Sequence, residues 1–97
     1  MKLELLYFDS CPNWRIAAER LDDVATRHGL TVNRRLVTTP EEAETGRFRG
    51  SPTILLDGED PFASGDEPVG LACRVYQTPD GPAVSPTTEQ LEAILDA

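Results

Sequence analysis

The sequence predicts an α/β protein with the element order β-α-β-α-β-β-α, a four-stranded mixed sheet and helices on both faces. Short apolar runs alternate with amphipathic stretches along the chain, and turn-forming residues separate them. The 97 residues, of which 39% are hydrophobic, are enough for a single core of two layers. We therefore expect residues 1–97 to form one domain.

The first half of the chain is expected to form a β-α-β unit. The run LELLYF, Leu3–Phe8, is apolar enough for a strand that is buried on both faces. In Pro12–His28 the apolar residues recur at intervals of three and four, which is typical of an amphipathic helix. Pro12 suits the first turn of this helix and Gly29 suits its end. A second strand, Thr31–Val37, should then pair in parallel with the first.

The second half is expected to supply the rest of the sheet and two further helices. Pro40–Phe48 has carboxylates in its first turn, as helix starts favour. Ile54–Leu56 is a short apolar strand, and the glycine-, proline- and acid-rich stretch Asp57–Gly70 is a surface loop. We expect Leu71–Gln77 to form the fourth strand, in a hairpin with the third, and Thr87–Leu95 to form a terminal helix.

Charge and cysteine content narrow the classes of function. Nine Lys and Arg against 17 Asp and Glu give a net charge of −8, which repels phosphate backbones and anionic lipids, so we expect no nucleic-acid or membrane partner. The N-terminus lacks the pattern of a secretory signal, which predicts a cytoplasmic protein. We expect no cofactor and no metal, because Cys11 and Cys73 are far apart in sequence and His28 has no ligand pattern near it.

The stretch FDSCPNW places Cys11 where a strand leads into a helix. Unpaired backbone N–H groups and the positive end of the helix dipole lower the pKa of a thiol at this position and favour the reactive thiolate. The alternative is that Cys11 is a small buried hydrophobic residue. Pro12 either starts the helix or holds the sulfur rigidly, and Trp14 either belongs to the core or shields the sulfur.

The position of Cys11 at the end of the first strand, with Ser51-Pro52 opening the third, resembles the thioredoxin fold. The resemblance implies a cis peptide bond before Pro52, with this proline lying against Cys11. Ser51 would then offer its backbone to an extended peptide or a thiol substrate. The sequence departs from the family at Trp14, which stands where the second, resolving cysteine is found.

The motifs FDSCPNW, GSPTILLDGEDPF and GLACRVY also look like those of short bacterial thioredoxin-like proteins that are sometimes labelled alkylmercury lyase. Organomercurial lyases break a carbon–mercury bond with two cysteines and an aspartate. The predicted hairpin would place Cys73 away from Cys11, so we expect Cys73 to be an unbridged, buried strand residue. The alternative is that Cys73 is a second active thiol.

Three functions are consistent with these residues. The first is monothiol redox or thiol exchange at Cys11, with Pro12, Trp14, Ser51 and Pro52 contacting the substrate, and with a low-molecular-weight thiol or a thiol/disulfide protein as partner. The second is a redox-inert binding module that uses the Pro52 edge and the acidic loop. The third is organomercurial cleavage, which would require Cys11 and Cys73 as a pair.

Overall fold

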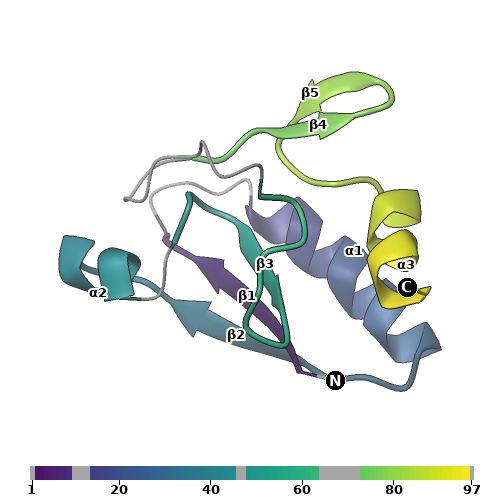
Figure 1. Cartoon of the computed structure of the whole chain (residues 1–97), viewed down its shortest axis with the longest axis horizontal. Helices are drawn as coiled ribbons and strands as arrows, with labels where there is room; N and C mark the ends of the chain where they lie inside the picture. Colours follow the sequence, from purple (N-terminus) through teal and green to yellow (C-terminus); the bar gives the residue numbers. More distant parts are fainter. Residues whose placement is uncertain (1, 10–13, 46–47, 64–72, 97) are drawn as a thin grey trace.

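A three-stranded mixed sheet forms the centre of the protein (Figure 1). Our computed structural model describes residues 2–9, 14–45, 48–63 and 73–96. Strand β1 (Leu3–Tyr7) lies in the middle of the sheet, with β2 (Val32–Leu36) parallel to it on one side. Strand β3 (Thr53–Leu56) runs antiparallel to β1 on the other side. The parallel pair expected at the start of the chain is confirmed.

Helices cover both faces of this sheet, and the alternation of side chains along β1 explains why. Leu3 and Leu5 belong to a buried cluster with α1 (Trp14–Arg27) and α3 (Thr88–Asp96). Leu6 points to the opposite face and joins a second cluster that includes Ala43 of α2 (Pro40–Thr45). Strand β1 is therefore buried on both faces, as its apolar run predicts.

The ends of the helices follow local capping chemistry. Gly29, directly beyond α1, has a φ of 70°, the left-handed conformation that glycine adopts without steric cost. At the start of α3, the backbone N–H of Gln90 donates to Thr87 Oγ1 (3.1 Å) and the N–H of Thr87 donates to Gln90 Oε1 (2.9 Å). This reciprocal capping box fixes where the terminal helix begins.

The prediction of a four-stranded sheet is wrong for the residues that the structure describes. The last strands, β4 (Tyr76–Thr78) and β5 (Gly81–Ala83), pair with each other in a separate two-stranded sheet. Figure 1 shows this hairpin projecting away from the central sheet. The stretch 78–86, which lies between the predicted fourth strand and the predicted terminal helix, therefore contributes a short strand. Residues 71 and 72 of the predicted fourth strand lie outside the described residues.

The chain that follows β3 explains why no long hairpin forms there. Asp57 and Gly58 have φ values of 52° and 86° and form a tight turn that returns Glu59 to a single bridge with Leu56. Pro61 has no N–H to continue a ladder, and the side chain of Asp60 is buried. The pairing with β3 therefore ends after one bridge.

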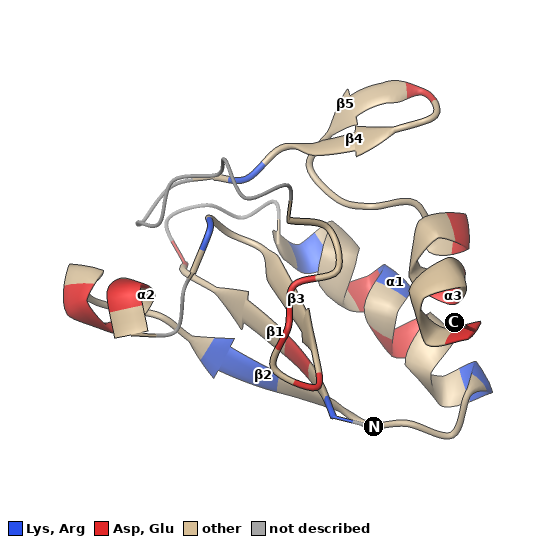
Figure 2. Ribbon diagram, in the orientation of Figure 1, with Lys and Arg blue, Asp and Glu red and all other residues tan. Residues whose placement is uncertain are grey.

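Charged residues are distributed unevenly over these elements. Figure 2 shows acidic residues on α2 and basic residues on β2, which is an edge strand with mostly exposed side chains.

None of the helices in the described part of the chain is long and apolar enough to cross a membrane.

Candidate functional site

The structure describes four of the six residues that the sequence singles out as a site. Cys11 and Pro12 lie outside the described residues. The four that are described are Trp14, Ser51, Pro52 and Cys73.

Ser51 and Pro52 form the buried centre of the candidate site, and the peptide bond between them is cis, as predicted. Ser51 Oγ accepts a hydrogen bond of 3.3 Å from the backbone N–H of Phe8. Phe8 directly follows β1, so this bond ties the carboxyl end of β1 to the residue before the cis-proline.

Cys73 differs from its prediction in two respects, because it is disulfide-bonded and exposed. Its backbone forms a parallel bridge with Ser51 and not an antiparallel ladder with β3. Cys73 therefore lies at the end of the sheet where Phe8 contacts Ser51, which is the opposite of the placement expected from a hairpin. The sequence contains one other cysteine, Cys11.

The backbone carbonyls at the cis-proline are occupied by residues of the same chain. The N–H of Arg74 donates to the carbonyl of Ser51 (3.0 Å), and the hydroxyl of Tyr76 donates to the carbonyl of Pro52 (2.6 Å). The carbonyl of Ser51, which we expected to face an extended peptide or a thiol substrate, therefore already has a partner within the chain. The segment Cys73–Tyr76 takes that place.

A buried ion pair, which we did not predict from the sequence, anchors this segment. Arg74 Nη1 lies 2.5 Å from Asp60 Oδ2 and Nη2 lies 3.4 Å from Oδ1, and the two side chains are only 3% and 1% exposed. Arg49 Nη1 lies 3.6 Å from the same carboxylate. The guanidinium of Arg74 also lies 4.5 Å from the ring centre of Tyr76. One signal was visible in the sequence, namely an arginine inside the apolar run LACRVY.

Trp14, at the start of α1, is partly buried against the first core cluster. Its ring stacks on Tyr7 at 4.2 Å between centroids, and the guanidinium groups of Arg15 and Arg34 lie 5.6 and 5.8 Å from its centre. These contacts agree with the interpretation of Trp14 as a core residue.

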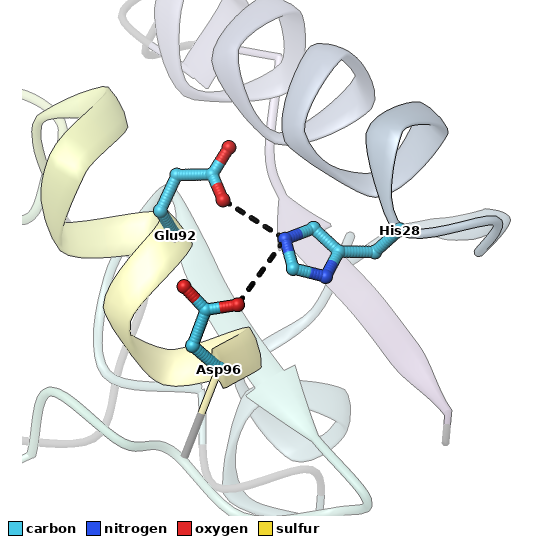
Figure 3. A group of neighbouring side chains, drawn as sticks. All are labelled: His28, Glu92 and Asp96. Carbon is cyan, nitrogen blue, oxygen red and sulfur yellow. Dashed lines mark hydrogen bonds and ion pairs between the residues drawn. The ribbon is translucent and has the colours of Figure 1, made fainter.

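His28, Glu92 and Asp96 are a second group that could hold a metal ion, since their donor atoms lie within 4.8 Å of one another (Figure 3). His28 Nε2 lies 2.9 Å from Glu92 and 3.7 Å from Asp96. The guanidinium of Arg27 contacts the other oxygen of Glu92 at 3.0 Å and would repel an added cation. Ion pairing between the end of α1 and α3 accounts for the group, and we assign it a structural role.

This group should make stability depend on pH. The hydrogen bond from His28, and then the charges of Arg27 and His28, lower the pKa of the partly exposed Glu92 carboxyl below its ordinary value of 4.5. A lowered pKa stabilises the fold above that value, and the contribution is lost as acid protonates the folded state. We expect Glu92→Gln to flatten the fall in Tm between about pH 5 and pH 3, measured by circular dichroism.

The matched control is Glu19→Gln, which removes an exposed carboxylate from α1. Glu19→Gln should leave the fall in Tm between about pH 5 and pH 3 as steep as in the wild type. Equal slopes in the wild type and Glu92→Gln would show that the Glu92 contact does not stabilise the fold.

A pocket of about 570 Å³ lies elsewhere, between the sheet and α2. Its walls include Leu6 and Leu55 together with Glu4 and Glu42. Glu4 is paired with Arg35 at 2.9 Å, and Glu42 accepts hydrogen bonds from Thr38. Among the described residues, Cys73, Ser51 and Pro52 do not line this pocket, so we do not include it in the candidate site.

The described geometry thus places an exposed, disulfide-bonded cysteine beside a buried cis-proline. Comparison of the chain with family models, with curated proteins and with solved structures finds no match.

Proposed function

We propose that this protein performs thiol–disulfide exchange within a thioredoxin-like frame, at a disulfide formed by Cys73 and Cys11. The observation that carries the proposal is that Cys73 is disulfide-bonded, exposed and paired with the residue before cis-Pro52. Exchange requires a disulfide sulfur that an attacking thiolate can reach, and an exposed Cys73 meets this requirement.

The choice of Cys11 as the second sulfur rests on sequence and on reach. The chain contains two cysteines, so an intramolecular disulfide of Cys73 has one possible partner. Phe8 donates its N–H to Ser51, and Ser51 pairs with Cys73. Cys11 follows Phe8 by three positions, a span of at most about 11 Å, which is enough to bring the Cα atoms of Cys11 and Cys73 within the distance that a disulfide allows.

The proposed cycle moves two electrons. A thiolate of an outside thiol attacks the exposed sulfur of Cys73, so that a mixed disulfide forms there and Cys11 leaves as a thiolate. Cys11 precedes α1, whose N-terminus favours a thiolate and so a good leaving group. A second outside thiolate then attacks the outside sulfur of the mixed disulfide and releases Cys73 as a thiolate together with an outside disulfide.

This cycle revises the expected monothiol mechanism, which depended on an unbridged Cys73. Cys73 supplies the second sulfur that Trp14 cannot. The order β1-α1-β2, the antiparallel β3 and the cis-proline support a thioredoxin-like frame. A cytoplasmic location remains part of the proposal, and disulfides in that reducing compartment are mostly catalytic or redox-sensing.

The experiment follows both products of the exchange. Oxidised protein is mixed with excess glutathione, and glutathione disulfide and alkylatable protein thiols are measured over time. We expect wild type to release glutathione disulfide and to gain two thiols, whereas Cys73→Ser and Cys11→Ser, lacking an internal disulfide, release none in this first turnover. A folded wild-type protein that keeps its disulfide in both glutathione and dithiothreitol would refute the proposal.

Organomercurial cleavage is a second candidate, and the disulfide bond of Cys73 favours it because two sulfurs must meet. In that reaction the carbon–mercury bond breaks, the carbon takes a proton and mercury stays on the two thiolates. The source of that proton is the least supported part of this candidate function, because the carboxylate of Asp60 is ion-paired with Arg74 and Arg49. Benzene released from phenylmercury by the reduced protein would support this activity, and its absence would exclude it.

A binding module without redox activity is less well supported. Its docking edge would be the backbone at Pro52, where Arg74 and Tyr76 already occupy the carbonyls.

A further inference from the structure

We infer that Arg74 and Asp60 are positioning residues for the disulfide, and that their ion pair keeps Cys73 beside Ser51 after the disulfide opens. The inference rests on the proposed exchange reaction and adds what controls its equilibrium. Arg74 is the residue next to Cys73, so an anchor on its side chain limits the movement of the neighbouring sulfur.

The anchor does not depend on sulfur. The guanidinium of Arg74 donates hydrogen bonds to both carboxylate oxygens of Asp60. Its backbone N–H donates to the carbonyl of Ser51, and its charge lies over the ring of Tyr76. Tyr76 in turn donates its hydroxyl to Pro52. Asp60 is itself held by the backbone N–H of Phe62, at 2.9 Å from Oδ1. Each of these contacts is available in the dithiol state.

Stability alone is a poor explanation for this ion pair. A buried pair of charges must be desolvated, and well-packed apolar residues often stabilise a fold as much or more. Arg74 Nε, moreover, is buried and has no hydrogen-bond partner in the part of the chain that the structure describes. An unsatisfied buried donor carries a further cost. A bidentate arginine does, however, fix a position more sharply than an apolar contact.

Fixing Cys73 affects the redox equilibrium through effective concentration. When the dithiol form already holds Cys73 at Ser51, closing the disulfide requires little further ordering of the chain. If the segment is released on reduction, closure must first restore its position. The anchor and the disulfide therefore stabilise each other reciprocally. Weakening the anchor should favour the dithiol over the disulfide.

The test is the equilibrium between oxidised protein and dithiothreitol, which yields the protein dithiol and cyclic oxidised dithiothreitol. We expect Arg74→Gln to lower the constant for disulfide formation by tenfold or more, which is a rise of about 30 mV in reduction potential. Arg74→Lys keeps the positive charge but cannot form two parallel hydrogen bonds with the carboxylate. Its constant for disulfide formation should lie between those of Arg74→Gln and wild type. Arg27→Gln, which loses partly exposed pairs with Asp23 and Glu92 at the far end of α1, should match wild type.

Hydrogen exchange in the reduced protein provides a second measurement. The Arg74 amide should stay protected in reduced wild type, because its bond to Ser51 does not involve sulfur, and should exchange freely in reduced Arg74→Gln. The inference would be overturned if the wild-type disulfide is reversible and Arg74→Gln changes the equilibrium constant for disulfide formation by less than twofold. The exchange function would still stand in that case. A wild-type disulfide that dithiothreitol cannot open would overturn both.

Discussion

Replacing Asp60 with asparagine should lower the free energy of unfolding by about 3–5 kcal/mol, the usual cost of leaving a buried charge without its partner. The substitution keeps the shape of the side chain and removes its charge. Arg74 would then be a buried cation without the Asp60 carboxylate, and Arg49 would lose the same partner. Urea unfolding of the oxidised protein measures the change.

The matched control is Asp22→Asn, because Asp22 also pairs with an arginine, Arg34, at 2.6 Å. That pair is about half exposed, so its loss should cost no more than about 1 kcal/mol. Equal losses of free energy of unfolding in Asp60→Asn and Asp22→Asn would mean that the buried Asp60 pair stabilises the fold no more than an exposed pair does. They would also remove the physical basis of the anchor.

Opening the disulfide should have an effect of similar size. If Cys73 is joined to Cys11, the bond closes a loop of about 60 residues, and the loss of this constraint on the unfolded chain corresponds to about 4 kcal/mol. We expect wild-type protein in reductant to unfold at a lower urea concentration than oxidised wild type. Its urea midpoint should be close to that of Cys73→Ser.

Cys73→Ser provides the internal control, because reductant should not change its unfolding. A wild-type midpoint that is insensitive to reductant, while alkylation shows that both thiols are open, would contradict the proposed loop. It would favour a disulfide that leaves the unfolded chain unconstrained, as a bond to a small outside thiol would.

Local patterns predicted the parts of the fold that depend on local chemistry. The apolar run of Leu3–Phe8, the periodicity of α1 and the apolar residues of the terminal helix each act over a few positions, and the structure contains all three elements. The cis bond before Pro52 was predicted from the resemblance to the thioredoxin fold, and it too is present.

The errors arose where distant segments meet. The strand after the long loop was expected to return antiparallel to β3, which would place Cys73 at the opposite end of the sheet from the one where it lies. The turn at Asp57 and the buried Asp60 redirect the chain, but the burial of an aspartate depends on an arginine 14 residues later. Periodicity and turn propensity contain no information about such a pair.

Peptide mapping by mass spectrometry tests the proposed disulfide of Cys11 and Cys73, after free thiols are blocked at the moment of lysis and the protein is digested without reductant. We expect a linked pair of peptides that contain Cys11 and Cys73, and a linked fraction that rises and falls reversibly with the ratio of glutathione disulfide to glutathione. Two fully blocked cysteines and no linked pair, even in oxidising glutathione buffer, would contradict the proposed disulfide.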